Sequence, residues 1–153
     1  MQSFLAGTGM RLPTEAEWEY ACRARPISAD RTAFHGTPAN PAGTNNDLLL
    51  GDIAWFNGNA NGQTRPVGGK APNGFGLFDM SGNVWEWVND RYSETYYQVS
   101  PVTDPPGPAS SSTRVLRGGS WLGGYVSGRT SVRNKNSPSF TSNTFGFRVA
   151  RNP

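Results

Sequence analysis

The segment at residues 73–88 reads Asn73-Gly74-Phe75-Gly76-Leu77-Phe78-Asp79-Met80-Ser81-Gly82-Asn83-Val84-Trp85-Glu86-Trp87-Val88. Its first half is rich in glycine, which can adopt the positive φ that a tight loop requires. In its second half, tryptophan alternates with other residues. In a strand, Trp85 and Trp87 would therefore share one face, and Glu86 would lie on the other. Two indoles on one face predict a core, and a carboxylate on the opposite face needs a partner. The segment therefore predicts a loop that leads into a strand.

A helix is predicted upstream of this segment. Thr14 can cap its N-terminus, and Glu17, three residues further on, can reach back in a capping box. Trp18 and Cys22 follow at a spacing that places both on one face of the helix. We expect the helix to end near Arg23.

Short strands and long loops are expected elsewhere. Residues 115–121 and 145–150 are predicted as the last two strands, and residues 52–56 as a short strand or buried anchor. Residues 26–50 are polar and lack periodicity, and residues 100–112 are rich in Pro and Ser. Both of these stretches are therefore expected to be loops.

The composition supports a loop-rich domain. The chain has 153 residues with 19 Gly and 12 Pro, 35% of its residues are hydrophobic, and 12% are aromatic. This favours short strands and ordered loops over a helical bundle, and the aromatic content argues against disorder. The length predicts a single domain over residues 1–153.

No stretch approaches the roughly 20 apolar residues of a membrane span, and the first ten residues lack the features of a secretory signal. The compartment stays open, and display on a virion or cell surface would require a partner or a further segment.

The charges are distributed unevenly. Residues 1–104 hold 7 Lys/Arg and 11 Asp/Glu, whereas residues 105–153 hold 7 Lys/Arg and no acid. Arginines spread singly through strands often form bidentate pairs with carboxylates from elsewhere in a fold. The alternative is contact with an anion or a nucleic acid. Because the basic residues form no run, we favour pairing over a nucleic-acid partner.

Cys22 and His35 are the only cysteine and the only histidine. A lone cysteine forms no disulfide within the chain and no cysteine-based zinc site. With one histidine, Ser-His-Asp catalysis and histidine-rich metal sites lose their strongest candidates. Cys22 is therefore expected to be a small core residue of the helix.

Four motifs span residues 11–151. They read Arg11-Leu12-Pro13-Thr14-Glu15-Ala16-Glu17-Trp18-Glu19-Tyr20-Ala21, then residues 73–87 as quoted above, then Arg117-Gly118-Gly119-Ser120-Trp121, then Gly146-Phe147-Arg148-Val149-Ala150. In this order they resemble the formylglycine-generating enzyme (sulfatase-modifying factor) family. The resemblance implies a C-type-lectin-like α+β fold with a small twisted antiparallel sheet, one or two helices and long ordered loops. Much of the family's usual N-terminal region has no counterpart in this sequence.

The resemblance also implies a structural calcium ion near the Asn-Val-Trp-Glu motif. Its ligands would be the side chains of Asp79 and Glu86 and the main-chain carbonyls of Gly82 and Val84. Hard oxygen ligands on a turn that contains glycine suit Ca²⁺. The alternative is that Glu86 pairs with an arginine instead.

Enzymatic activity in that family requires a cysteine pair that binds copper and activates oxygen. The corresponding segment here, residues 122–131, contains no cysteine. Gly, Ser and Val cannot replace thiolate ligands of copper. We therefore expect no copper and no formylglycine-forming activity. The alternative is an oxidoreductase or enzyme subunit of the family that has lost the cysteine pair.

The C-terminal region, about residues 117–151, is similar to that of the variable proteins of diversity-generating retroelements. In those proteins, template-directed mutagenesis at adenines rewrites selected codons, often Asn codons, upstream of a Gly-Phe-Arg strand. Most residues between the anchors here are of types reachable from an Asn codon, although Lys135 also needs a different third base. We call the following the variable-type residues: Leu122, Gly123, Gly124, Tyr125, Val126, Ser127, Val132, Asn134, Lys135, Asn136, Ser137, Phe140, Ser142, Asn143 and Thr144.

These residues predict a binding surface for a protein or glycan ligand. Apolar side chains among them would supply contact area, and Ser and Asn would supply adaptable hydrogen bonds. A scaffold stabilised by tryptophans and strands would leave such loop side chains free to change. The alternative is an ordinary solvated loop, whose Asn, Ser and Gly content reflects turns.

Overall fold

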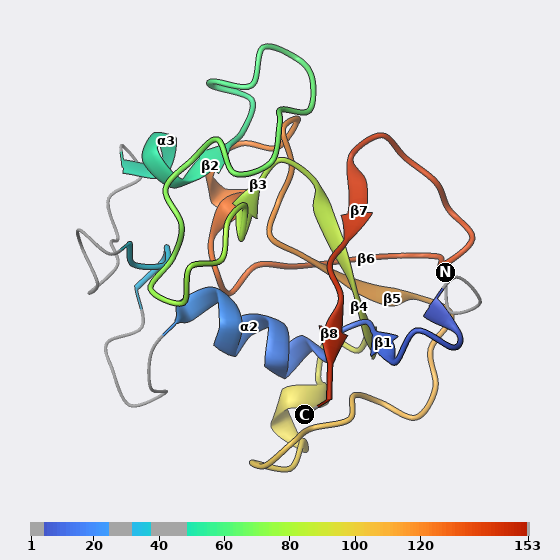
Figure 1. Cartoon of the computed structure of the whole chain (residues 1–153). Coiled ribbons are helices and arrows are strands. Elements are labelled where there is room, and N and C mark those ends of the chain that lie inside the picture. Colours follow the sequence, from blue (N-terminus) through green and yellow to red (C-terminus); the bar gives the residue numbers. More distant parts are fainter. Residues whose placement is uncertain (1–4, 25–31, 38–48, 153) are drawn as a thin grey trace.

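The computed structural model describes residues 5–24, 32–37 and 49–152. Its helices and strands are short, and long loops join them (Figure 1). In chain order the elements are β1 (Met10–Arg11), α2 (Glu15–Arg23), α3 (Leu50–Ile53), β2 (Ala54–Trp55), β3 (Ser81–Gly82), β4 (Trp85–Arg91), the 3-10 turn η2 (Tyr96–Gln98), β5 (Arg114–Arg117), the 3-10 turn η3 (Tyr125–Gly128), β6 (Arg133–Asn136), β7 (Phe145–Phe147) and β8 (Ala150–Arg151). This is the expected loop-rich α+β structure.

The main sheet has four strands in the order β6-β5-β4-β7. β4 and β5 are antiparallel, as are β5 and β6, but β7 lies parallel to β4. The sheet is therefore mixed, whereas the resemblance implied an antiparallel one. A parallel neighbour needs a long connection, and here the chain passes through β5, η3 and β6 before β7. Two further pairs complete the fold, β1 with β8 and β2 with β3.

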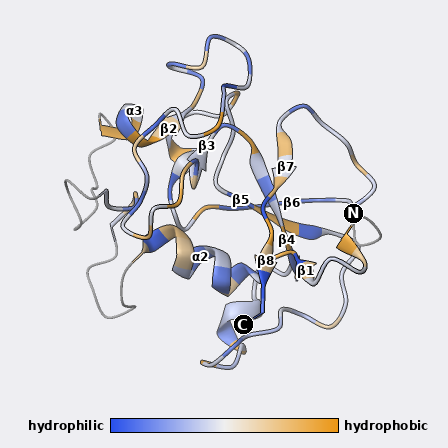
Figure 2. Cartoon of the chain, in the orientation of Figure 1, coloured by the Kyte–Doolittle hydropathy of each residue, from blue (hydrophilic) through white to orange (hydrophobic). Residues whose placement is uncertain are grey.

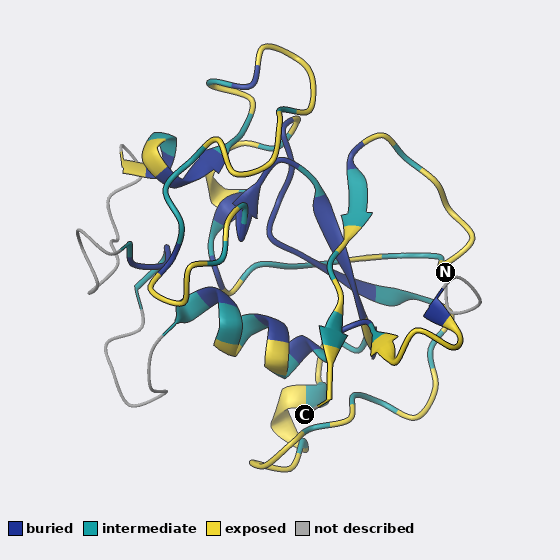
Figure 3. Cartoon of the chain, in the orientation of Figure 1, coloured by how far each residue is buried: buried dark blue, intermediate teal, exposed yellow. Residues whose placement is uncertain are grey.

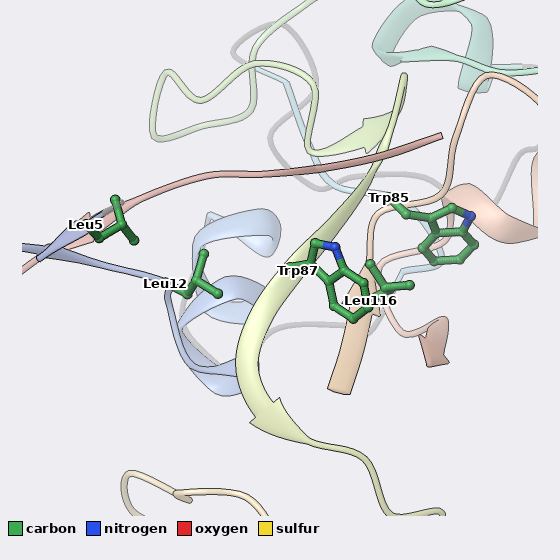
Figure 4. Close-up of a cluster of buried hydrophobic side chains, with 5 residues drawn as sticks. All are labelled: Leu5, Leu12, Trp85, Trp87 and Leu116. Atoms are coloured by element: carbon green, nitrogen blue, oxygen red, sulfur yellow. The ribbon is translucent and has the colours of Figure 1, made fainter. Parts of the chain in front are cut away.

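The alternation predicted for β4 is confirmed. Trp85 and Trp87 lie on one face and pack with Leu5, Leu12 and Leu116 (Figure 4). Phe145 on β7 meets Trp87 edge to face, with 5.6 Å between the ring centroids. On the opposite face, α2 contributes the buried side chains of Trp18 and Cys22, which pack with Met80, Val88 and Val115. Both faces of the sheet are thus covered, and the exposed residues are concentrated in the loops (Figure 3).

Helix α2 begins where the sequence predicts. The Thr14 hydroxyl accepts a hydrogen bond from the Glu17 N–H, and the Glu17 carboxylate accepts one from the Thr14 N–H, so the capping box is complete. The helix ends at Arg23, followed by Ala24 with a φ of 52°. Apolar residues alternate with polar ones along α2 (Figure 2). Among the described residues, no helix is long and apolar enough to cross a membrane.

Four sequence expectations differ from the structure in detail. Residues 145–150 contain β7 and the first residue of β8, not a single strand. β5 ends at Arg117 and not at residue 121, because Gly118 and Gly119 both turn the chain at positive φ. Residues 52–56 contain the end of α3 and the two-residue strand β2, not a single strand. Most of the loop expected over 26–50 lies outside the described residues. The polar strand β6 was not expected.

Ion pairs join the basic C-terminal third to acids on α2 and β4, as the charge distribution predicts. Arg117 pairs with Glu15 and Glu19 at 3.4 and 2.7 Å. Arg133 binds the same Glu15 through two nitrogens, at 2.7 and 2.8 Å. Arginines on β5 and β6 are therefore tied to the helix that covers this face of the sheet.

Asp90 on β4 anchors the start of α2 and makes stability depend on pH. Its Oδ2 accepts a hydrogen bond from the Glu15 N–H at 2.7 Å. Burial raises the pKa of Asp90 to about 6. Since the pKa is higher in the folded than in the unfolded chain, this group adds stability as the pH falls from about 6 to about 4, and loses it as the pH rises.

We expect Asp90→Asn to keep the hydrogen bond and remove this pH dependence. Relative to wild type, the variant should gain about 1–2 kcal/mol in its free energy of unfolding at pH 7, allowing for solvent screening. The gain should shrink toward pH 5. Urea denaturation at both pH values measures the difference, and an equal effect at the two values would contradict this assignment.

Candidate functional site

The four residues expected to hold calcium line one pocket of about 380 Å³. Glu86 comes from β4, Gly82 from β3, and Asp79 and Val84 from the turns beside them. The turn requires glycine at position 82, where φ is +77° and a Cβ would lie 2.2 Å from the Trp55 carbonyl oxygen. The other residues that line the pocket are Val67, Gly68, Phe78, Asn83, Phe147 and Arg148. The four residues named by the motif therefore line a common pocket.

Glu86 already has partners in this pocket. Arg148 Nε and Nη2 donate to its two carboxylate oxygens, each at 2.6 Å, and Trp18 Nε1 donates to Oε2 at 2.6 Å. Arg148 Nη2 also reaches the main-chain oxygens of Phe78 and Asp79, at 3.2 and 3.4 Å. The buried carboxylate opposite the tryptophans therefore has an arginine partner, which was the alternative to calcium.

Asp79 is less completely satisfied. Its Oδ2 accepts a hydrogen bond from the Gly68 N–H at 2.8 Å, but its Oδ1 is buried without a hydrogen-bond partner. A buried carboxylate oxygen without a partner is costly, and a bound cation would relieve that cost. Ca²⁺, however, takes about six to eight oxygen ligands, and Arg148 occupies both oxygens of Glu86. The residues therefore fit a hard cation at Asp79, whereas Glu86 as placed does not.

The variable-type residues come from three segments, namely the loop around η3, strand β6 and the loop before β7. Their exposure falls into three groups. Exposed residues are Leu122, Gly124, Tyr125, Val126, Lys135, Phe140 and Asn143. Half-buried residues are Gly123, Ser127, Val132, Asn134, Asn136, Ser137 and Ser142, and Thr144 is buried.

The two loops are held to the scaffold by main-chain hydrogen bonds. Gly123 O accepts from Asn57 N at 3.0 Å, and Thr144 O accepts from Trp85 N at 2.8 Å. The Trp121 indole donates to Asn143 O at 3.3 Å, which ties the second loop to the residue that precedes the first. The main chain is therefore fixed at these points.

Four apolar side chains on these loops project outward. They are Leu122 (63% exposed), Tyr125 (45%), Val126 (49%) and Phe140 (52%). Phe140 also touches Phe145, with 5.8 Å between ring centroids. Apolar side chains exposed on a fixed main chain supply contact area that a partner can cover.

Some variable-type residues instead support the scaffold. Val132 packs against the cluster around Trp85 and Trp87. Thr144 is only 8% exposed, and its hydroxyl lies 2.8 Å from that of Ser142. Residue type alone does not separate these positions from their exposed neighbours.

A stack of aromatic rings and cations adjoins β6 and was missed from the sequence. The Arg133 guanidinium lies 4.7 Å from the ring centroids of both Tyr92 and Tyr97. Lys135 Nζ lies 4.5 Å from the Tyr92 centroid on the same side of the strand. The signal in the sequence was the group of tyrosines at 92, 96 and 97.

Cys22 and His35 lie in the core. The Cys22 side chain is fully buried, and burial raises the pKa of its thiol to about 12. His35 is 4% exposed, and burial lowers the pKa of its imidazole. Neither residue lines the pocket around Asp79. Cys22 is the small core residue that the sequence predicted.

Comparison with known proteins places these features in a family context. Residues 2–153 match the sulfatase-modifying factor enzyme 1-like domain. The formylglycine-generating enzyme of Streptomyces coelicolor is 43% identical over 148 residues, which cover 93% of this chain and 46% of that protein. Serine/threonine-protein kinase pkn1 of Chlamydia pneumoniae is 36% identical over 146 residues, covering 94% of this chain and 21% of the relative.

Two solved structures are similar over nearly the whole chain. Treponema denticola variable protein 1 has a TM-score of 0.82 and 40% identity, over 94% of this chain and 48% of its own. PvdO from Pseudomonas aeruginosa has a TM-score of 0.73 and 30% identity, over 97% of this chain and 55% of its own. The chain thus spans about half the length of these two proteins.

Proposed function

Because the chain belongs to the sulfatase-modifying factor enzyme 1-like family, we propose that it is a non-catalytic, ligand-binding member whose C-terminal segment forms a diversified surface. The observation that carries the proposal is the set of four exposed apolar side chains on loops with a fixed main chain. The similarity to a solved variable protein supports it. The exposed residues suit a protein or glycan ligand, since they combine apolar contact with polar groups.

The chemistry of the chain supports a non-catalytic role. A copper site of the formylglycine-generating kind needs two thiolates, and residues 122–131 offer none. The single thiol, Cys22, is buried with a raised pKa, so it supplies no thiolate at neutral pH. A cysteine pair is thus absent both from the sequence segment and from the chain.

The second candidate is an oxidoreductase, or an enzyme subunit, that has lost the copper-binding pair. The identity to a formylglycine-generating enzyme favours it. Copper binding and oxygen consumption with a thiol-containing peptide distinguish the two functions. We expect neither, and stoichiometric copper with oxygen-dependent turnover would overturn the non-catalytic proposal.

The diversified surface is tested in the genome that encodes the chain. We expect a near-copy of the codons for residues 117–151 close to a reverse-transcriptase gene. The two copies should differ at adenines of the template, and the differences should fall on the variable-type residues. A complete genome without such a repeat would contradict diversification and leave the family assignment intact.

We further propose that a structural Ca²⁺ ion binds at Asp79. Asp79 would hold it together with the carbonyls of Gly82 and Val84, and Glu86 would join only if freed from Arg148. Removal of bound Ca²⁺ with a chelator should then lower the midpoint of thermal unfolding, and addition of Ca²⁺ should restore it. In Asp79→Asn, the midpoint of thermal unfolding should no longer depend on Ca²⁺. An unchanged midpoint after verified metal removal would rule out this role.

A further inference from the structure

The outer edge of strand β6 is closed by two of its own side chains. β6 lies at the end of the four-stranded sheet and pairs with β5 on its inner side. Asn134 Oδ1 accepts a hydrogen bond from the Lys135 N–H, and Asn136 Oδ1 accepts one from the Ser137 N–H, each at 2.8 Å. Trp85 N–H donates to Thr144 O beside β7, so the main chain of Glu86 faces β5 and that of its partner Arg117 faces β4. By alternation Leu116 and Asn134 bond each other, and the N–H groups of residues 135 and 137 face away from β5.

These two N–H groups are where a further strand would bind. An edge strand presents unpaired main-chain groups that can pair with another extended chain. A solvent-accessible hydrogen bond that a main-chain N–H donates to the side chain of the preceding residue is weak, because water competes for both groups. An incoming strand can therefore displace the two asparagine side chains. A residue at position 134 or 136 that has no side-chain acceptor would leave the next N–H group unpaired and available to such a strand.

We infer that β6 binds an extended, acidic segment of a partner protein by strand addition, with Asn134 and Asn136 setting the affinity. This inference rests on the proposed function and names the partner class for the β6 part of the surface. Both asparagines are variable-type residues. A change at either position would therefore alter the main-chain recognition as well as the side chain displayed.

Charge selects an acidic partner. Lys135 is exposed, and in the described part of the chain it makes no ion pair, contacting the Tyr92 ring instead. Arg133 lies on the same face of β6 but is already paired with Glu15, so the preference for an acidic partner rests on Lys135. Residues 105–153 contain no acid. Antiparallel pairing with a second copy of β6 about Lys135 would place Lys135 opposite itself, which is unfavourable. An acidic side chain at that position relieves the repulsion, so a foreign strand is favoured over a second copy.

The other face of β6 determines which residues of the partner segment alternate with glutamate. Asn134 pairs in register with Leu116 and so lies on the face of the sheet that carries Trp85 and Trp87. An added strand places alternate side chains on this face. The expected partner segment therefore alternates glutamate with valine or threonine, which also favours an extended conformation.

The test uses capped heptapeptides that alternate glutamate with valine or threonine. They are titrated into the isotope-labelled full chain while the amide signals of Lys135 and Ser137 are followed by NMR. We expect weak binding to the wild type, and binding about tenfold tighter to the Asn134→Ala/Asn136→Ala double variant. Peptides with lysine in place of glutamate should bind neither protein. Equal affinity of wild type and double variant, or equal binding of acidic and basic peptides, would overturn the inference.

Two further variants, made in the double-alanine protein, distinguish the contribution of the main-chain N–H of residue 135 to peptide binding from that of the Lys135 charge. Lys135→Pro removes the outward N–H, and β6 tolerates it because β5 does not use that group. Lys135→Ala removes the charge and keeps the N–H. We expect Lys135→Pro to abolish binding and Lys135→Ala to weaken it, with similar melting temperatures. Binding that survives Lys135→Pro would exclude strand addition. The genomic repeat is unaffected by this result, so failure here is distinguishable from failure of the proposed function.

Discussion

Glu86→Ala is expected to lower the free energy of unfolding by about 3–5 kcal/mol. The change leaves the guanidinium of Arg148 without its bidentate carboxylate and the buried Trp18 indole without its acceptor. The Arg148 side chain is only 24% exposed, so a guanidinium that loses its carboxylate partner there keeps much of its desolvation cost and loses the compensating attraction. Urea denaturation in the presence of a chelator measures the loss without a contribution from calcium.

Exposed residues of the binding surface provide the matched controls. Val126→Ala and Phe140→Ala remove side chains that are 49% and 52% exposed. Each should change the free energy of unfolding by less than about 1 kcal/mol, while ligand binding weakens. Losses of similar size at all three positions would contradict the division between a stable scaffold and a replaceable surface.

A double-variant cycle isolates the pair itself. The cycle uses Glu86→Leu and Arg148→Met. Each single change leaves the other side chain charged without its partner, so both should be strongly destabilising. Glu86→Leu combined with Arg148→Met removes both charges and places apolar groups of similar length in the site. The loss in the double variant should be smaller than the sum of the single losses by about 1–3 kcal/mol. An additive result would mean that the two side chains do not stabilise each other.

Local signals in the sequence predicted the parts of the fold that depend on neighbouring residues. The capping box of Thr14 and Glu17 located the start of α2, and the alternation of Trp85 and Trp87 identified the faces of β4. Both features act over a few residues, so they can be recognised without knowing the fold. That Asp79, Gly82, Val84 and Glu86 lie around one site was implied only by the family resemblance, and the structure places all four at one pocket.

Features that depend on distant partners could not be predicted in this way. β6 reads Arg-Asn-Lys-Asn, which shows no alternation of apolar residues, and it is a strand because β5 supplies its hydrogen bonds. β7 is parallel to β4 because of the path of the intervening chain, which no local pattern specifies. The same limit applies to Glu86: the sequence indicates that its carboxylate needs a partner, but Arg148 is 62 residues away.

Arg117→Met is the second change for which we expect a large loss, about 3–5 kcal/mol in the free energy of unfolding. The Arg117 side chain is fully buried. Its Nη2 donates to Glu19 Oε2 at 2.7 Å and to Thr130 O at 2.6 Å, and its Nη1 donates to Val132 O at 3.0 Å. Methionine fills a similar volume but donates no hydrogen bond, so these acceptors lose a partner.

Two comparisons show whether the hydrogen-bonding geometry or the charge stabilises the fold at Arg117. Arg117→Lys keeps the charge, but a single ammonium group cannot reproduce a planar guanidinium that binds acceptors in several directions, so about half of the loss should remain. Arg11→Ala removes an arginine whose pair with Glu17 is exposed, 38% and 45% respectively, and should cost less than about 1 kcal/mol. Similar losses for Arg11→Ala and Arg117→Met would refute the argument from burial.

Arg117 also connects stability to the binding surface. The carbonyl oxygens that it binds belong to Thr130, Ser131 and Val132, which join η3 to β6. Both neighbouring elements carry variable-type residues, so loss of Arg117 should loosen the main chain that positions them. Hydrogen exchange in Arg117→Met should therefore accelerate over residues 129–136 more than in β4, under conditions where the variant is still folded. Uniform acceleration over the whole sheet would show that Arg117 stabilises the fold globally and does not specifically order this connection.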